Sequence, residues 1–566
     1  MKEQNKKERL ELFSDLYSAA KAAYADTAER LERNMRQYLG TDEVDGSSER
    51  AKVVRNISYE IIESEVTPTI PMPRVDISSY SDKRSDSAKA IERLCRAIRQ
   101  RLPFESMNDS DERYTYIYGG SVWYIEWDSS ISGVRAHCIS PLDFIPQPGV
   151  SRVEDMEYCF LRFTTTRGEL VRKYGVGVDQ VRLAECEYEY PEAISMSDTV
   201  KLVIAFFRDA DGYIGRFIFS GGLVLSDIPD FYRRRERVCK ACAKPYGNCE
   251  CHVGYKSKAL TLEKVTLGGK QISVPYYTPD AFPIIIRKNT FAVSGHLGSS
   301  DCEKIRPQQQ AINKLETRIM QKLMRSGVTP VMPEDATVSL SNAIFGQVIK
   351  LRAGESLEHY GKIDTTPDIE EDVKEADRLY DQAKRILGIS DALQGTDNTK
   401  SESGYARQLK ISQANSRLES KRRLKGECYA QIYRLIFKHY LAFADECESL
   451  CYKDELGKLQ LSEFNRSDFI EPDGIGGYKY NDDYLFSIDE SEGDGYQREA
   501  LWERNLMNLE SGTLGDKNSP ATLLRYWQSQ ERAHYPYAGE NVEYFISIIE
   551  REKGADTKDE GRNRSA

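Results

Sequence analysis

The chain has 566 residues, 40% hydrophobic and 30% charged, a composition typical of folded globular proteins. At roughly 150 residues per domain, this length predicts three or four structural units rather than one core. The formal net charge of −11 argues against a protein that binds nucleic acid strongly over its surface, because such proteins carry a basic surface.

No apolar run reaches about 18 residues, so we expect no membrane-spanning helix. The first residues, MKEQNKKERLELF, contain no apolar core and do not have the pattern of a secretory signal peptide. Eight of the twelve cysteines are scattered, and we expect reduced thiols that are mostly buried. Cys447 and Cys451 are predicted to lie one helical turn apart in a structural role.

The N-terminal part of the chain is predicted to begin with helices. Residues 3–38 form a polar helix with one apolar side, and shorter helices follow at about 49–65 and 82–101. The pattern then changes to strands from Tyr114 to Trp127, where aromatic and β-branched residues predominate.

The strand pattern continues after Trp127. Further strands are predicted at 134–139, 157–164, 201–207, 213–219 and within 272–290. The region from about 50 to 300 is therefore predicted to form an α+β body.

Two amphipathic helices flank a compact insert in the middle of the chain. The first covers about 302–325, and its apolar residues form one stripe: Ile312, Leu315, Ile319, Leu323 and Met324. The second begins at Pro367 behind the N-cap Thr366 and ends before Gly388. Because neither helix can bury its stripe alone, we expect a protruding stalk, tipped by the insert, that packs against neighbours.

A polar loop follows the second helix and leads into a very long helix at about 403–446. Strands are then predicted at 458–463 and 483–488. Helices follow at about 496–511, 520–533 and 541–551. The last fifteen residues, 552–566, are charged and nearly free of apolar groups, so we expect them to be disordered.

This order of segments resembles the portal proteins of tailed double-stranded DNA bacteriophages, as do the phrases Ser140-Pro-Leu-Asp-Phe-Ile-Pro146 and Ser403-Gly-Tyr-Ala406. Portal proteins form a ring at one capsid vertex, through which the genome is packaged, retained and ejected. The resemblance covers about 50–480. It implies a structural protein of the virion, assembled in the host cytoplasm, that is not an enzyme.

The resemblance divides the chain into the parts of a portal subunit. These are an N-terminal wing region (1–300) with an insert at about 235–256, a stem helix (301–327), a clip (328–366), a second stem helix (367–388), a tunnel loop (389–403), a long helix with further wing (404–480), a crown (481–551) and a disordered tail (552–566).

The resemblance also implies partners. These are eleven further copies in a dodecameric ring, the terminase large subunit, head-completion and tail adaptor proteins, and the major capsid and scaffolding proteins. Double-stranded DNA would pass through the channel without sequence-specific contacts. In the tunnel loop, Lys400 is the expected phosphate contact, with Asn398 and Thr399 beside it. The alternative is an ordinary surface loop.

A cysteine-rich segment is the sharpest local signal for a cofactor. Cys239, Cys242, Cys249 and Cys251 lie within thirteen residues, and His252 follows directly. A C-x-x-C pair supplies two thiolates on one turn, and four protein ligands make a closed structural zinc site. We predict Zn²⁺ on the four cysteines, with His252 as the substitute ligand. The alternative is a redox-active or metal-free loop. The nearby Arg233, Arg234 and Arg235 are predicted to be a solvated surface or, alternatively, a phosphate or acidic contact.

The sequence does not contain the enzymatic motifs for which we searched. Gly268-Gly-Lys270 lacks the remaining residues of a P-loop, and the histidines are far apart without an H-E-x-x-H pattern. Two other hypotheses stay open. One is a zinc-dependent enzyme or nucleic-acid processing protein, and the other is a monomeric zinc-containing adaptor.

Overall fold

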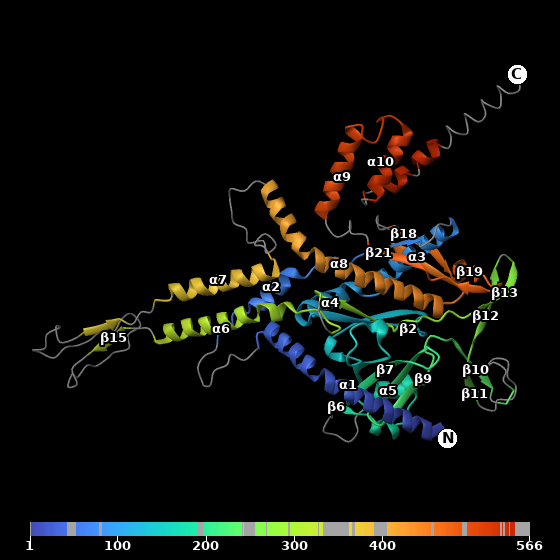
Figure 1. Ribbon diagram of the computed structural model, residues 1–566, viewed down its shortest axis with the longest axis horizontal. Coiled ribbons are helices and arrows are strands. Elements are labelled where there is room, and N and C mark those ends of the chain that lie inside the picture. The colour runs from blue at the N-terminus through green and yellow to red at the C-terminus, as the bar shows by residue number, and fades with distance from the viewer. Residues whose placement is uncertain are drawn as a thin grey trace, which may run out of the picture.

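The long helix α8 (Gly404–Phe443) runs through the centre of the molecule in the computed structural model, and other elements gather around its C-terminal half (Figure 1). Its buried face carries Cys428, Ile432, Ile436 and Tyr440, spaced four residues apart on one side of the helix. These side chains pack in one hydrophobic core with residues of the helices and strands around α8. Helix α8 therefore lies at the centre of the main core.

The structure describes residues 2–41, 53–77, 82–188, 196–239, 241–242, 255–267, 269–291, 295–325, 328–331, 361–364, 368–389, 404–453, 458–488, 495–532, 535, 538–542 and 544–549. Within them the fold mixes helices and strands, which confirms the α+β class at that level. No helix of this described part is long and apolar enough to cross a membrane.

The helices before and after α8 are α1 (Lys2–Leu39), α2 (Ile57–Glu65), α3 (Asp82–Arg101), α4 (Phe104–Tyr118), α5 (Arg167–Tyr174), α6 (Asp301–Arg325), α7 (Glu370–Leu387), α9 (Gly495–Glu510) and α10 (Pro520–Arg532). Short 3-10 helices are η1 (Pro141–Asp143), η2 (Val153–Asp155), η3 (Gln180–Leu183) and η6 (Arg466–Phe469).

Two antiparallel sheets form the body. The six-stranded sheet contains β4 (Phe144–Pro146), β5 (Tyr158–Thr166), β6 (Cys186–Tyr188), β7 (Thr199–Arg208), β8 (Ile214–Ser220) and β9 (Leu223–Ile228). The three-stranded sheet has the order β14 (Ile284–Lys288), β2 (Gly120–Asp128) and β3 (Gly133–Ile139).

The remaining strands form antiparallel pairs. These are β1 (Pro73–Ile77) with β21 (Tyr484–Ile488), β10 (Arg235–Cys239) with β11 (Tyr255–Ala259), β12 (Leu262–Leu267) with β13 (Lys270–Pro275), β15 (Val328–Val331) with β16 (Gly361–Asp364), β17 (Cys447–Lys453) with β18 (Leu459–Asn465), and β19 (Ile470–Pro472) with β20 (Tyr478–Tyr480).

The body is built in layers. Helix α1 covers one face of the six-stranded sheet, where Phe13 packs against the ring of Phe217. The opposite face, including Ile204, packs against the three-stranded sheet. The far face of that second sheet carries Trp123 and Ile285 into the core around α8. Alternate residues of each strand thus serve two different cores, as the pleat requires.

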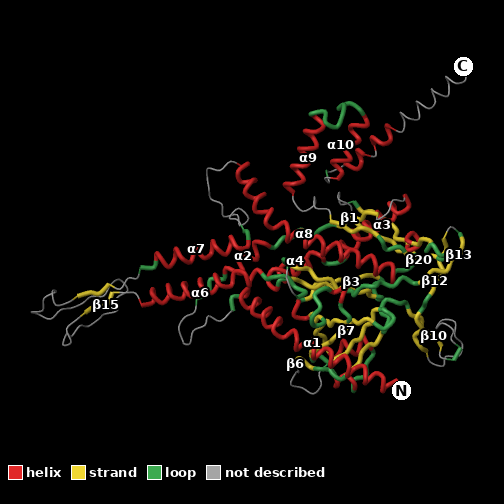
Figure 2. Tube along the Cα trace, viewed as in Figure 1, coloured by secondary structure: helices red, strands yellow, loops and turns green. Residues whose placement is uncertain are grey.

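A hairpin of two helices projects from this body. Helices α6 and α7 lie side by side, and the strand pair β15–β16 lies at their distal end (Figures 1 and 2). Figure 2 shows the strands of the body gathered on the opposite side of the molecule from this tip, with α9 and α10 set apart from both. We call α6, α7 and the β15–β16 pair the stem hairpin.

Most predicted elements are present within a few residues. Helix α6 matches the prediction for 302–325, and Gly388 ends α7 in the left-handed conformation expected of a C-terminal cap. The structure also bears out the long helix and the strands of the two main sheets. The predicted helix at 49–65 is shorter, since residues 53–56 are not helical and Asn56 caps α2.

Three predictions of local structure were wrong. Tyr114–Tyr118 is the last turn of α4 rather than a strand, because this segment completes a helix that buries polar residues on its inner side. Cys447 and Cys451 lie on strand β17, not on successive helical turns, because α8 ends at Phe443. Helix α7 begins at Glu370, because residues 368–369 are not helical, and the predicted start at Thr366 and Pro367 lies outside the described residues. The Asp368 side chain accepts a hydrogen bond from the Glu370 backbone amide.

Candidate functional site: the stem hairpin and the charge network at its base

Apolar contacts hold the base of the stem hairpin together. Ile57 and Ile61 of α2 meet Ile305 and Ile312 of α6, and Ala383 of α7 closes the cluster. All five side chains are fully buried. The spacing of four or seven residues within each helix places these groups on one face, so three helices share one small core.

Polar contacts continue along the hairpin beyond this core. The Asp372 carboxylate of α7 pairs with Lys322 and, at 3.8 Å, with Arg318 of α6. Arg55, which precedes α2, lies 3.2 Å from Asp377 of α7. These ion pairs are partly exposed, so each contributes little to stability. Their main effect is to fix how α6 and α7 are aligned.

Apolar side chains of the distal hairpin are left exposed. Met320, Leu323 and Met324 of α6 and Val373 of α7 face solvent, and Met324 is 71% exposed. They belong to the same amphipathic helices that bury Ile305, Ile312 and Ala383 at the base. Several exposed apolar groups on one projecting element are typical of a surface that packs against another protein.

The tip of the hairpin is closed by backbone pairing. In the antiparallel register, Val328 lies opposite Asp364, and Val331 lies opposite Gly361. The two ends of the predicted clip therefore come together directly beyond α6. The rest of the predicted clip, residues 332–360 and 365–366, lies outside the described residues.

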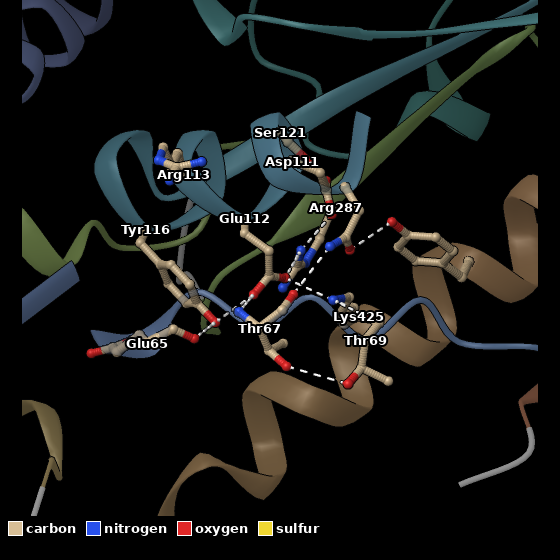
Figure 3. A network of polar contacts seen from close by, with 12 residues as sticks. Glu65, Thr67, Thr69, Asp111, Glu112, Arg113, Tyr116, Ser121, Arg287 and Lys425 are labelled. Atoms are coloured by element: carbon tan, nitrogen blue, oxygen red, sulfur yellow. Dashed lines mark hydrogen bonds and ion pairs between the residues drawn. The ribbon is translucent and has the colours of Figure 1, made fainter. Parts of the chain in front are cut away.

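A buried network of charged residues connects α4, β14 and α8 (Figure 3). Arg287 of β14 contacts both Asp111 and Glu112 of α4, the latter at 2.6 Å. Asp111 also accepts hydrogen bonds from Ser121 and, at 2.9 Å, from the Trp123 indole. Arg287 and the two acids are 2% exposed or less, so water cannot replace any of these contacts.

Helix α8 contributes a second cation to this network. The Lys425 ammonium lies 3.1 Å from Glu112 and donates to the Thr69 carbonyl at 2.7 Å (Figure 3). Burial alone raises the pKa of Glu112, but the charges of Arg287 and Lys425 outweigh burial and hold that pKa below its usual range. Glu112 is thus ionised, and it ties α4 to both β14 and α8.

One turn earlier on α8, Lys421 makes a further connection. Its ammonium lies 2.7 Å from a carboxylate oxygen of Glu65, the last residue of α2. It also lies 2.7 Å from Asp301, the first residue of α6. Both carboxylates are buried, and the Lys421 side chain is 11% exposed. Lys421 therefore joins α8 to the base of the stem hairpin.

Sequence reasoning missed this network, although a signal was present. Lys421 and Lys425 continue the four-residue spacing of the buried residues Tyr429, Tyr433 and Phe437. A lysine at a core-facing position needs a buried acidic partner. The partners come from segments far away in the sequence, since Asp111 and Arg287 are 176 residues apart.

The predicted zinc segment is only partly described. Cys239 is buried at the end of β10 and lies opposite Tyr255 of β11, so the strand pair brings together the two ends of the cysteine-rich segment. Cys242 is half-buried. Cys249, Cys251 and His252 lie outside the described residues. Among the residues that the structure describes, no group of three or more His, Cys, Asp or Glu side chains could hold a metal ion.

The arginine run beside this segment makes structural contacts, of which the acidic contact was the predicted alternative and the Arg234 contacts with backbone carbonyls were not predicted. Arg234 donates to the carbonyl oxygens of Ala442, at 3.2 Å, and of Ala444, at the C-terminus of α8. Arg233 and Arg235 both pair with Asp230. A guanidinium at a helix C-terminus satisfies carbonyl groups that have no partner within the helix.

The predicted channel residues Asn398, Thr399 and Lys400 lie in residues 390–403, outside the described part of the chain. The flanking residues are placed: Ile389 follows α7, and α8 begins at Gly404. No protein-family model matches this chain, and no curated protein matches it.

Proposed function

We propose that this chain is a phage portal protein. In this proposal it forms a ring at the capsid vertex for genome packaging, retention and ejection, and it has no catalytic role. The observation that carries the proposal is the stem hairpin, which projects from the body and exposes Met320, Leu323, Met324 and Val373. A ring of identical subunits supplies each hairpin with the neighbours that such a surface needs.

The arrangement around the hairpin supports the same proposal. In a portal subunit the stem stands between a clip and the wing, and here the hairpin lies between the β15–β16 tip and the layered body. The tip would then dock the terminase large subunit and later head-completion or tail proteins. Helices α9 and α10 would belong to the crown.

The segment between α7 and α8 is the proposed tunnel loop. Lys400 would make weak contacts with phosphate groups of the DNA, repeated once per subunit around the ring. Such contacts need not distinguish base sequences. The net charge of −11 fits a channel through which DNA slides without being held tightly.

Replacing apolar stem residues tests this proposal. The double variant Met320→Glu, Met324→Glu places two charges where the proposed neighbour packs. Burying a methionine contributes about 1.5–3 kcal/mol, and 1.4 kcal/mol corresponds to a tenfold change in an equilibrium constant. We expect wild-type protein to be a large oligomer by light scattering, and the variant to need at least tenfold higher concentration to assemble.

The control is Gln310→Glu, which adds one charge at an exposed position of the same helix. It should assemble like the wild type. Circular dichroism distinguishes a folded monomeric variant from a misfolded one. A wild-type protein that is monomeric at every concentration tested contradicts the proposal, as does a double variant that assembles normally.

A further inference from the structure

The Lys421 ammonium contacts both Glu65 of α2 and Asp301 of α6, two of the three helices that meet at the base of the stem hairpin. The aromatic ring of Tyr116 lies beneath this ammonium, 4.9 Å from its centre. Beyond this point α8 enters the core at Cys428. Any rotation of the stem base relative to the body must therefore change the contacts of Lys421.

The charges around Lys421 do not balance when every group is ionised. Glu65 and Asp301 supply two negative charges, and Lys421 supplies one positive charge. Lys304 of α6 reaches Asp301 at 3.0 Å, but its side chain is 31% exposed and is therefore screened by water. From α4, Tyr116 and the ionised Glu112 face the same space.

Glu65 is the group that responds to this imbalance. Burial, followed by the negative charge of Asp301, raises the pKa of Glu65 to about 8, although Lys421 and Lys304 lower it. Its Oε1 atom is buried and has no hydrogen-bond partner, whereas Oε2 contacts Lys421. An ionised Glu65 would place this buried carboxylate oxygen where no described side chain or backbone amide donates to it, which is costly.

We propose that Glu65, Asp301 and Lys421 form a proton-dependent joint. The joint fixes the stem base to α8 while Glu65 carries a proton, and it loosens when that proton passes to solvent. In the protonated state Lys421 balances Asp301 alone. After the proton leaves, two buried carboxylates face one ammonium, and their mutual repulsion favours separation of α6 from α2 and α8.

The direction of the pH effect follows from the two states of Glu65. In the unfolded or opened chain the Glu65 pKa returns toward its ordinary value of 4.5, whereas in the closed joint it is about 8. The free energy that Glu65 contributes to the closed joint is therefore complete below pH 4.5. It is lost as the pH rises toward 8. Mildly alkaline conditions should loosen the stem base.

Hydrogen–deuterium exchange of the full-length protein at pH 7 and pH 9 tests this joint. After correction for the intrinsic exchange rate, we expect residues 301–310 and 418–427 to exchange about tenfold faster at pH 9. Residues 428–441 of the buried half of α8 should not change. In Glu65→Gln, which imitates the protonated acid, the difference between the two pH values should disappear.

Two further variants separate the joint from a general loss of structure. Glu419→Gln removes an exposed carboxylate two residues from Lys421 and should behave like the wild type. Asp301→Asn removes the neighbouring charge, so the midpoint of the exchange transition should move to lower pH. The proposal is overturned if Glu65→Gln retains the wild-type pH response, if the Asp301→Asn midpoint does not move, or if the wild type shows no local acceleration.

Discussion

Arg287 is the residue that neutralises the buried acidic pair of α4. Replacing it with methionine leaves Asp111 and Glu112 without their shared guanidinium, and Lys425 reaches only Glu112. Loss of one partner of a buried ion pair costs about 3–5 kcal/mol. We expect Arg287→Met to lower the free energy of unfolding by that amount in denaturant titrations.

The control for this substitution is Arg152→Met, which removes an exposed arginine that lies 3.5 Å from Glu154. Surface pairs contribute about 0–1 kcal/mol, so its effect should be small. Equal effects of the two substitutions would show that the buried network does not stabilise the fold.

The burial of His439 predicts that the folded protein loses stability in acid. The His439 Nδ1–H donates to the Leu435 carbonyl at 2.8 Å, and Nε2 is buried without a partner. Burial lowers the pKa of His439 to about 4, from an ordinary value of 6.5. Its contribution to stability is therefore complete above pH 6.5 and is lost as the pH falls toward 4.

We expect the free energy of unfolding to fall by roughly 1–2 kcal/mol per such histidine between pH 7 and pH 5. His439→Gln cannot be protonated and should reduce this pH dependence in denaturant titrations at the two pH values. His137→Gln is the control, because His137 is 41% exposed. An unchanged slope for His439→Gln would show that His439 is not buried in its neutral form.

Single cysteine substitutions test the predicted zinc site. If the cysteine-rich segment holds a structural ion, purified protein contains about one zinc per chain by elemental analysis. Cys239→Ser and Cys249→Ser should each remove most of it, whereas the exposed Cys447→Ser should keep it. Wild-type protein that stays free of zinc after growth with added zinc would contradict the prediction.

At the scale of elements, Gly119 allows the end of α4 to approach the segment that contains Gly298 closely. It ends α4 with a φ of +88°, and its carbonyl accepts hydrogen bonds from Asn289 and Gly298. A Cβ atom at Gly119 would lie 2.3 Å from the Gly298 oxygen. We expect Gly119→Ala to destabilise the protein by more than about 3 kcal/mol in thermal or denaturant unfolding.

Gly175→Ala is the matched control for backbone conformation. Gly175 also has a positive φ, +65°, but nothing lies within 4 Å of an added Cβ atom. Its substitution should cost about 1 kcal/mol, from the left-handed conformation alone. Similar losses for both variants would mean that the close approach at Gly119 contributes nothing.

The elements that sequence analysis predicted well are those whose signal is local. The apolar spacing of α6 and α8 is visible within each segment, and their bounds were predicted within three residues. The end of α4 was predicted wrongly because Tyr114–Tyr118 carries aromatic residues that favour strands, whereas its helical conformation depends on tertiary packing.

At the scale of the whole molecule, sequence patterns did not show which distant segments meet. The joint unites the end of α2, the start of α6 and the middle of α8, and Lys421 is 356 residues from Glu65. No periodicity within one segment specifies such partners. The projecting stem hairpin was predictable, because two amphipathic helices around an insert imply it before any contact is known.

Electron microscopy of the purified full-length protein, without imposed symmetry, tests the proposed function most directly. Our account predicts closed rings with a central hole wide enough for duplex DNA and with the stem hairpins of adjacent subunits in contact. A monodisperse monomer, even at high protein concentration and low salt, would contradict it.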